Sequence, residues 1–498
     1  MSTTTPLRAD TLAVIADRVP VPGYERAGVT SGVVHVGVGG FHRAHQAMYH
    51  DRLMNAGAAL DWGICGVGVL AADRRMHDVM RAQDGLYTLV AKHADGSRDA
   101  RVIGAMTEHR LAPDDPEAVI ERMADASTRI VSLTITEGGY NLDDATGQFD
   151  ATNPDVVRDL QPGAAPRTTF GLVTEALRRR RERRLAPFTV MSCDNLQGNG
   201  RLARMVFSEF ARLRDPALGD WVEQEVPFPS SMVDRITPAT TEADVAEVRE
   251  RFGIEDAWPV VCEPYTQWVL EDAFSAGRPP YEDAGVQIVD DVEPYELMKL
   301  RLLNASHQAI AYFGYLCGYR FVHEAAQDPL FRGLLAGYMD EEATPTLAPV
   351  PGVDLPSYKR TLIERFSNPE VRDTIPRLCA ESSDRIPKWL LPVVREQLAT
   401  GGEITRSAAI VASWARYAEG IDEQGRPIEV ADRLADRLME SARRQREDPD
   451  AFIANRDVFG DLADDPRFKA AYRSTLNALH EHGARATLSS MIGEEMNV

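Results

Sequence analysis

Cysteine is scarce in this sequence of 498 residues, and its copies are widely scattered: Cys65, Cys193, Cys262, Cys317 and Cys379. Their number is odd, and no two of them form a CxxC pair. This pattern argues against a disulfide framework and against a structural zinc site. It is typical of a protein kept in a reducing cytoplasm, which is the compartment that we expect.

Long apolar runs and an excess of positive charge are also lacking. The first eight residues contain no apolar core of a secretory signal, and the longest apolar stretch, about residues 309–319, is too short to cross a bilayer. Lys and Arg number 55 against 76 Asp and Glu, which gives a net charge of −21. Such a charge repels phosphate groups, so we expect neither nucleic acid nor a membrane as a partner.

The first 290 residues alternate short β-branched runs with helical patterns, as βαβ units do. Four runs are typical of buried parallel strands: residues 33–36, 63–69, 129–135 and 188–193. Helical patterns and a predicted antiparallel hairpin lie among them: helices 42–56, 116–124 and 168–184, and hairpin strands 87–92 and 101–105. These patterns predict an α/β fold in which residues 1–290 form a Rossmann-type, doubly wound domain with insertions.

From residue 291 onward, long helical patterns dominate: 295–317, 357–366, 389–400, 407–419, 430–446 and 466–480. We therefore predict a boundary near Asp291 and a mainly α-helical substrate-binding and catalytic domain over residues 291–498. A run of positive charge closes the earlier helix 168–184, and we expect it to be a solvated helix face: Arg178, Arg179, Arg180 and Arg181.

A glycine turn follows the first predicted strand and precedes a helix, as in dinucleotide-binding folds. Gly37 allows a tight turn, and Gly39 lets the backbone approach a pyrophosphate at the helix N-terminus. His42 stands where such turns usually have a third glycine. A plain tight turn is the alternative. The candidate cofactor-binding residues in this segment are Gly37, Gly39, Gly40, Phe41, His42 and Arg43.

An acidic residue, Asp73, follows the second predicted strand. A carboxylate there can accept hydrogen bonds from an adenosine ribose and repel a 2′-phosphate, which favours NAD over NADP. Arg74 and Arg75 come next and could instead hold a 2′-phosphate. The alternative for Asp73 is the N-cap of a helix.

One predicted helix gathers polar residues on a face that also carries leucines. At about 100° per residue, Glu296, Lys299, Asn304 and His307 share an arc of roughly 140°. Apolar residues cover most of the remaining circumference, so we expect these groups to be buried and either satisfied structurally or functional. A lysine in a partly dry cleft has a lowered pKa and can take the proton of a secondary alcohol as hydride leaves.

Two amides fit the same chemistry. Side-chain NH₂ groups can hold the alkoxide that develops, and Asn195 follows the strand 188–193 at the carboxyl end where open α/β sheets bind ligands. Tyr295 and Lys299 are also spaced YxxxK, the pattern of short-chain dehydrogenases, in which tyrosine is the acid/base. The glycine turn lacks the TGxxxGxG form of that class, so we favour the lysine.

Four segments carry a family resemblance: residues 37–46, 136–140, 192–196 and 299–307. Through them the chain resembles the polyol-specific long-chain dehydrogenase/reductase family over about residues 30–440. The resemblance implies NAD-dependent, metal-independent oxidation of a polyol at a secondary carbon. It assigns these roles: Lys299 as base, Asn195 and Asn304 as alkoxide holders, Glu296 on a proton route, His307, Arg377 and Asp234 at the substrate, and Thr136 and Glu137 at the cofactor.

Two departures from the family pattern bear on specificity. Arg385 precedes Ile386-Pro387 where a lysine is usual, so contact with the sugar chain differs. Ala72 precedes Asp73 where relatives carry an acidic residue, which weakens a strict preference for NAD.

The expected reaction is the interconversion of D-mannitol and D-fructose with NAD, and the expected partner is this small polyol or ketose. Reduction of fructuronate or tagaturonate is an alternative, because Arg377 and Arg385 could bind a carboxylate. Oxidation of arabinitol or sorbitol and a non-catalytic NAD sensor also remain open. We expect no bound metal, although His42, His45 and His50 could form a fortuitous metal face, and we expect a monomer or a weak homo-oligomer.

Overall fold

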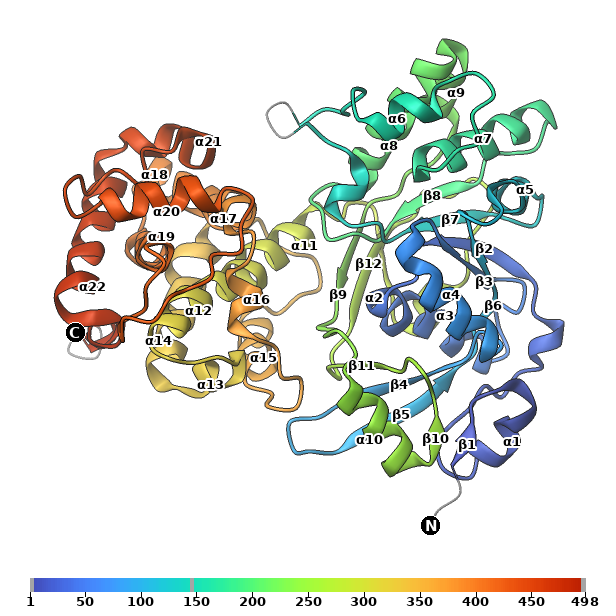
Figure 1. Cartoon of the computed structure of the whole chain (residues 1–498), viewed down its shortest axis with the longest axis horizontal. Helices are drawn as coiled ribbons and strands as arrows, with labels where there is room; N and C mark the ends of the chain where they lie inside the picture. The colour runs from blue at the N-terminus through green and yellow to red at the C-terminus, as the bar shows by residue number, and fades with distance from the viewer. Residues whose placement is uncertain (1–3, 144–146, 494–498) are drawn as a thin grey trace. The chain divides into compact units, whose positions relative to one another are not determined.

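A computed structural model describes residues 4–143 and 147–493 of the chain. The chain divides into two compact units, Met1–Glu293 and Pro294–Val498. Figure 1 shows a parallel sheet with flanking helices in the first unit and helices in the second. In the part of the chain that is described, no helix is both long and apolar enough to span a membrane.

The central sheet of the first unit has five parallel strands in the order β6-β3-β2-β7-β8. Their bounds are β2 (Ser31–Val36), β3 (Gly63–Gly68), β6 (Met106–Leu111), β7 (Ile130–Leu133) and β8 (Thr189–Ser192). Strands β2, β3, β7 and β8 are buried along their whole length, as expected for a parallel sheet covered on both faces. The four predicted strands are confirmed, whereas β6 was not predicted.

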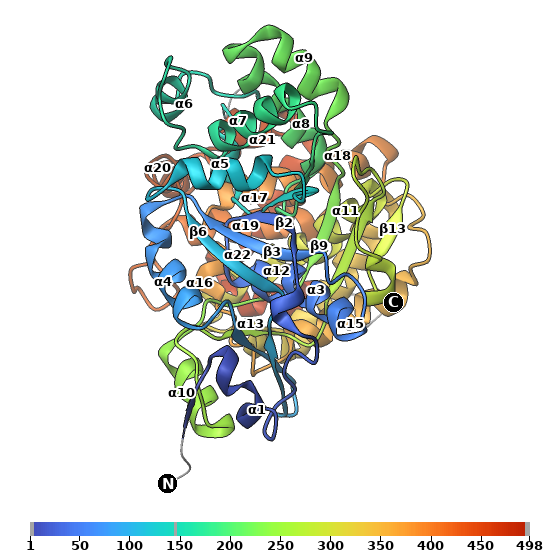
Figure 2. The ribbon, with the colours of Figure 1, turned by 90° about the vertical axis from the view of Figure 1, so that its right-hand side faces the viewer.

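Helices cover both faces of this sheet. Val34, Val36 and Val131 share one apolar core with α5 (Pro116–Ala124), α7 (Thr169–Glu182) and α8 (Asn199–Arg214). On the other face, Val33 and Ile64 pack in a second core with α3 (Gln46–Asn55) and α4 (Arg74–Ala82), and α4 lies beside β6 in Figure 2. The prediction of a doubly wound, Rossmann-type domain is confirmed.

Side-chain caps explain why two of the predicted helices begin where they do. The Asp115 carboxylate accepts a hydrogen bond of 2.9 Å from Ala118 N, and Pro116 follows it at the first helical position of α5. The Thr168 hydroxyl accepts a hydrogen bond of 3.0 Å from Gly171 N at the start of α7.

Two smaller sheets extend the first unit. The predicted hairpin is present as β4 (Tyr87–Lys92) and β5 (Arg98–Ile103), and β11 (Val260–Cys262) adds to β4 in parallel. A second sheet has the order β13-β12-β9, with β9 (Ser231–Asp234), β12 (Gln267–Glu271) and β13 (Gln287–Val289). The remaining elements are β1 (Thr5–Pro6), η1 (Ala9–Thr11), α1 (Leu12–Ile15), η2 (Arg26–Gly28), α2 (Gly40–Ala44), η3 (Ala71–Asp73), η4 (Glu137–Tyr140), α6 (Pro154–Asp159), α9 (Pro216–Glu225), α10 (Glu242–Phe252), β10 (Ile254–Glu255) and η5 (Tyr281–Ala284).

The second unit is helical, as predicted. Its first helices are α11 (Glu293–Met298), the π-helix η6 (Lys299–Asn304), α12 (Ala305–Leu316), α13 (Val322–Gln327), α14 (Pro329–Gly337) and the π-helix η7 (Tyr338–Ala343). The later helices are α15 (Leu355–Phe366), α16 (Ile375–Cys379), α17 (Ser382–Trp389), α18 (Leu391–Thr400), α19 (Thr405–Ala418), α20 (Ala435–Arg444), α21 (Arg456–Phe459) and α22 (Pro466–Gly493).

Some helix predictions need correction. The predicted helix 42–56 is two helices, α2 and α3, because His45 between them has φ −120° and ψ −90°. The predicted helix 295–317 is interrupted by the π-helix η6. Helix α20 begins only at Ala435, and α22 continues past residue 480 to Gly493, with a non-helical Gly483 inside it.

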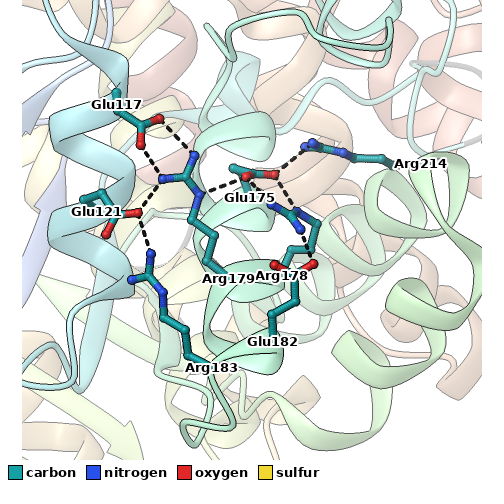
Figure 3. Close-up of polar contacts among 8 residues, drawn as sticks. All are labelled: Glu117, Glu121, Glu175, Arg178, Arg179, Glu182, Arg183 and Arg214. Atoms are coloured by element: carbon teal, nitrogen blue, oxygen red, sulfur yellow. Dashed lines mark hydrogen bonds and ion pairs between the residues drawn. The ribbon is translucent and has the colours of Figure 1, made fainter.

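The arginine run of α7 is not the solvated face that the sequence predicted. Figure 3 shows Arg179 bound to Glu117 and Glu121 of α5 and to Glu175 of α7. Arg180 is only 2% exposed and donates hydrogen bonds to the backbone carbonyls of Asp125, Thr128 and Ala186. Arg179 and Arg180 therefore join α7 to its neighbours, and only Arg181 of the run is exposed as predicted.

Candidate active site

The glycine turn after β2 has the shape that the sequence predicted. Gly37 has φ +93°, and a Cβ there would lie 2.1 Å from the Thr134 carbonyl oxygen, so only glycine fits. Gly39 is exposed, and the nearest atom to a Cβ at that position is the Gly37 carbonyl oxygen at 4.0 Å. The protein itself does not fill this space, which fits the close approach of a dinucleotide pyrophosphate to the backbone.

The residues after the turn are mostly buried. The His42 ring stacks on His35 of β2 with centroids 3.4 Å apart, and this flat contact lets α2 approach the strand without the usual third glycine. Burial lowers the pKa of His42 well below its ordinary value, so the ring is neutral. Arg43 is fully buried, binds the Trp258 carbonyl and lies over the Tyr87 ring. Its side chain anchors the helix, and a contact with the cofactor stays a prediction, as it does for Gly40 and Phe41.

Asp73 closes the turn that follows β3. Its Oδ2 accepts hydrogen bonds of 2.8 Å from Val69 N and 2.8 Å from Leu70 N. The two arginines that could hold a 2′-phosphate have other contacts: Arg74 donates to Asp114 at 2.8 Å, and the Arg75 guanidinium lies 4.6 Å from the Trp258 ring centroid. This arrangement supports NAD as the preferred cofactor. Asp73 occupies the N-cap position of α4, as the alternative predicted, but its carboxylate binds the turn before α4 and makes no cap hydrogen bond to that helix.

The loops after β7 and β8 carry Thr136, Glu137 and Asn195, and all three are exposed. They lie at the carboxyl ends of neighbouring parallel strands, where open α/β sheets bind ligands. Asp194, which precedes Asn195, is buried and contacts both loops. We did not single out Asp194 from the sequence, although its place directly before Asn195 at a strand end was a signal. Asp234 ends β9 and is also buried.

The polar residues of the second unit lie on and beside the π-helix η6. The exposed fractions are 5% for Glu296, 7% for Lys299, 4% for Asn304 and 9% for His307. The predicted burial of these four side chains is therefore confirmed. Burial of Lys299 matters most, because an amine in water would keep its ordinary pKa and would be a poor base. The 140° arc is not valid, because a π-helix has i→i+5 hydrogen bonds and turns less per residue than the assumed α-helix.

Contacts from other helices support η6. The Arg301 guanidinium binds Glu396 with hydrogen bonds of 2.8 and 2.6 Å and the Thr346 carbonyl with one of 2.6 Å. The buried Tyr338 hydroxyl, at the start of η7, donates to the Arg301 carbonyl at 3.0 Å. Such outside partners satisfy polar groups of a widened helix turn.

One amide in this helix is poised for a ligand. Within residues 4–143 and 147–493, Asn304 Nδ2 is buried and has no hydrogen-bond partner. A buried donor of this kind costs about 1–3 kcal/mol unless something binds it. Tyr295 differs, because its hydroxyl donates to the Pro351 carbonyl at 2.7 Å. This contact favours Lys299 over Tyr295 as the acid/base.

The remaining candidate residues of the second unit come from three helices, α16, α17 and α12. Arg377 of α16 binds Asp373 through hydrogen bonds of 2.6 and 2.5 Å. Arg385 of α17 donates to the backbone carbonyls of Arg377 and Leu378 at 3.1 and 3.3 Å. His307 lies against Phe366, with ring centroids 4.6 Å apart.

Two of the three histidines of the candidate metal face, His45 and His50, have protein hydrogen-bond partners instead. His45 Nε2 lies 2.8 Å from the Gln267 carbonyl oxygen, and His50 Nδ1 lies 2.9 Å from the Trp62 carbonyl oxygen. Across the described ranges, no cluster of three or more His, Cys, Asp or Glu side chains could hold a metal ion.

Comparison with known proteins gives matches over almost the whole chain. Residues 31–283 match the mannitol dehydrogenase Rossmann domain, and residues 291–480 match the mannitol dehydrogenase C-terminal domain. Mannitol 2-dehydrogenase of Aspergillus fumigatus is 46% identical over 481 residues, which cover 95% of this chain and 96% of that protein. The Pyricularia oryzae enzyme of the same name is 44% identical over 492 residues, 98% of each chain.

Two solved structures are similar over the same length. The ternary complex of Pseudomonas fluorescens mannitol 2-dehydrogenase with NAD and D-mannitol has a TM-score of 0.90 and 44% identity, covering 98% of this chain and 100% of that one. A D-sorbitol dehydrogenase in substrate-free form has a TM-score of 0.89 and 36% identity, covering 97% and 100%. The resemblance found in the sequence is thereby confirmed, and the chain belongs to the mannitol dehydrogenase family of polyol dehydrogenases.

Proposed function

We propose that this protein oxidises D-mannitol to D-fructose with NAD and catalyses the reverse reduction. The observation that carries this proposal is the buried, unpartnered Asn304 amide on the same π-helix as the buried Lys299. An amine can take the hydroxyl proton of a secondary alcohol, and an amide donor can stabilise the alkoxide that develops as the alcohol is oxidised. The full-length similarity to a mannitol 2-dehydrogenase bound to NAD and D-mannitol supports this substrate and cofactor.

Cofactor binding is assigned to residues 1–290, and the substrate roles are assigned to residues 291–498 together with Asn195 and Asp234. Lys299 takes the hydroxyl proton of the polyol, and the amides of Asn304 and Asn195 donate hydrogen bonds to the alkoxide. Bound NAD supplies the acceptor for the hydride that leaves the same carbon. Glu296 passes the proton on from Lys299. Substrate hydroxyls are bound by His307, Arg377, Arg385 and Asp234.

The cofactor-binding part of the proposal depends on the first unit. The open space at Gly39 receives the pyrophosphate, and the Asp73 carboxylate accepts hydrogen bonds from the ribose. Thr136 and Glu137 line the same carboxyl edge of the sheet. The proposed reaction needs no metal, because Lys299 provides the base and the two amides stabilise the alkoxide.

A hexuronate substrate is the second candidate, and the ion pair of Arg377 favours a neutral polyol over it. The positive charge of Arg377 is balanced by Asp373, to which it binds through two hydrogen bonds. A substrate carboxylate would have to compete with Asp373 for that guanidinium. Sorbitol and arabinitol carry no carboxylate, so this argument does not separate them from mannitol. The structural similarity to a D-sorbitol dehydrogenase supports testing both polyols.

A substrate panel tests the proposal. Purified protein is assayed near pH 9 with D-mannitol, sorbitol and arabinitol, each with NAD and with NADP, and in reverse with D-fructose and fructuronate. We expect the highest kcat/KM with D-mannitol and NAD, and in reverse with D-fructose. A kcat/KM for fructuronate at least about tenfold above that for D-fructose would contradict the proposal. Binding of NAD without turnover of any polyol would indicate a sensor instead.

A further inference from the structure

We propose that Asp194 is a positioning residue that holds Asn195 and the Thr136–Glu137 turn in their working arrangement through a carboxylate shared by two loops. This inference rests on the proposed function, because it gives Asn195 the role of an alkoxide donor. Asp194 itself acts through these neighbours.

The geometry of Asp194 is that of a clamp between the ends of β7 and β8. Its Oδ1 accepts a hydrogen bond of 2.8 Å from Thr136 N, and its Oδ2 accepts one of 3.2 Å from Ile135 N. Oδ2 also accepts one of 2.8 Å from the fully buried Tyr140 hydroxyl. Three donors from the loop after β7 thus bind one carboxylate at the end of β8. Asp194, which carries this carboxylate, is only 6% exposed.

The clamped turn has a strained backbone. Thr136 has φ 63° and ψ 171°, a conformation that is normal for glycine and costs other residues about 1–3 kcal/mol. Such a conformation persists only when surrounding contacts hold it. Because Asp194 binds Thr136 N directly, its carboxylate is the contact that holds this turn and directs Glu137.

The backbone of Asp194 is held separately from its side chain. Asn199 at the start of α8 donates to the Asp194 carbonyl at 2.9 Å and binds Ser231 of β9 through both its amide nitrogen and its amide oxygen. A change of the Asp194 side chain therefore leaves the end of β8 in place. The expected effect of the change is a shift of Asn195 and of the Thr136–Glu137 turn by a few tenths of an ångström, which is enough to weaken a transition-state contact.

The first test is Asp194→Asn, which keeps the shape but replaces one acceptor oxygen with a donor. We expect kcat and kcat/KM for D-mannitol oxidation to fall together by about 30-fold or more, with KM within about threefold of the parent. The matched control is Asp159→Asn, because Asp159 is buried in the same unit and accepts hydrogen bonds from Arg167 N, Thr168 N and the Thr168 hydroxyl. We expect this control to lose thermal stability but to keep kcat within about threefold.

The second test asks whether Asp194 acts through Asn195. If it does, adding Asp194→Asn to Asn195→Ala lowers kcat by no more than about threefold beyond Asn195→Ala alone. Losses that multiply in full in the double variant would exclude an action through Asn195 and overturn the inference, whereas a smaller further loss is the part expected from the Thr136–Glu137 turn. An Asp194→Asn protein with kcat within about threefold of the parent, or an equal loss in Asp159→Asn, would also overturn the inference.

A milder variant keeps the test decisive if Asp194→Asn does not fold. Tyr140→Phe removes a single donor from the clamp, and we expect a loss of about 3- to 10-fold in kcat with KM unchanged. Full activity in a folded Tyr140→Phe protein would contradict the clamp. A parent protein that oxidises no polyol contradicts the proposed function, whereas an active parent, an impaired Asn195→Ala and an unimpaired Asp194→Asn contradict only this inference.

Discussion

The two units position their candidate site residues in different ways. In the first unit, site residues lie on loops at the ends of parallel strands, and the carboxylates of the half-buried Asp73 and the buried Asp194 hold the loop backbone. In the second unit, they project from a helix whose winding is altered at Lys299–Asn304. The position of a strand-end loop is determined by the order of the strands in the sheet, and its side chains can be exposed. A helical site depends on local winding and buries its polar groups. Each prediction below probes one side of this contrast.

The largest expected effect is at the π-helix. Lys299→Ala should lower kcat for D-mannitol oxidation by about 10²-fold or more, because no other group takes the hydroxyl proton. Tyr295→Phe is the matched control in the preceding turn and should keep kcat within about tenfold, since its hydroxyl is bound to the Pro351 carbonyl. Steady-state kinetics on both variants gives the two values of kcat. A larger loss in Tyr295→Phe than in Lys299→Ala would assign the acid/base role to the tyrosine.

In the first unit, Asp73→Ala should raise the KM for NAD by about tenfold and lower the preference for NAD over NADP. The change removes both the ribose acceptor and the cap on Val69 N and Leu70 N. Asp114→Ala is the control, because Asp114 binds the neighbouring Arg74 but does not cap this turn. The account of the cofactor turn is wrong if Asp73→Ala leaves both KM values unchanged.

A smaller effect is expected from the support of the π-helix. Tyr338→Phe leaves the Arg301 carbonyl without its hydroxyl partner and should lower kcat by about threefold to fivefold, with about 1 kcal/mol of lost stability. Tyr472→Phe removes another buried hydroxyl of the same unit, which donates to Gln445 at 3.0 Å. It should cost similar stability and leave kcat unchanged. Equal kinetics in the two variants would show that the contact at Arg301 does not affect the site.

The smallest effect on turnover is expected in the ion network of Figure 3, which changes stability instead. Burial would raise the pKa of Glu175, but hydrogen bonds from Arg178 and Arg179 and the charge of Arg214 lower it from 4.5 to about 2. A carboxylate with a depressed pKa stabilises the folded state above its unfolded pKa, and this contribution is lost as the pH falls from about 4.5 to about 2.

Glu175→Gln should therefore lower the thermal midpoint by about 2–4 °C at pH 7, with kcat unchanged. The difference from the parent should shrink between pH 4.5 and pH 2. Glu182→Gln, which removes an exposed partner of Arg178, is the control and should change the midpoint by less than about 1 °C. A difference that stays constant with pH would contradict the assignment of the shift to Glu175.

Much of the first unit could be predicted from its sequence. Buried parallel strands have a plain signature of β-branched runs, and the Gly37 turn can be recognised because only glycine adopts its φ of +93°. The same patterns place Asn195 at a strand end. The burial of Arg180 could not be predicted, because it depends on the carbonyls of three residues that the fold brings to it.

In the second unit, the burial of the candidate site residues could be predicted from the sequence, but their geometry could not. Apolar periodicity predicted the burial of Lys299 and Asn304, which the structure confirms. It could not predict the π-helix, because widening of a helix turn is determined by outside partners such as Tyr338 and Glu396. The role of Asp194 was missed for a related reason, since its donors come from the loop after another strand.

The most direct test of the central claim is chemical rescue of Lys299→Ala. If an amine takes the proton of the polyol, methylamine should restore D-mannitol oxidation, with a rate that rises linearly with the concentration of unprotonated amine. Asn304→Ala, whose lesion is a lost hydrogen-bond donor, should not respond to methylamine. A Lys299→Ala protein that is folded and binds NAD but shows no rescue at any pH would contradict the assignment of Lys299 as the base.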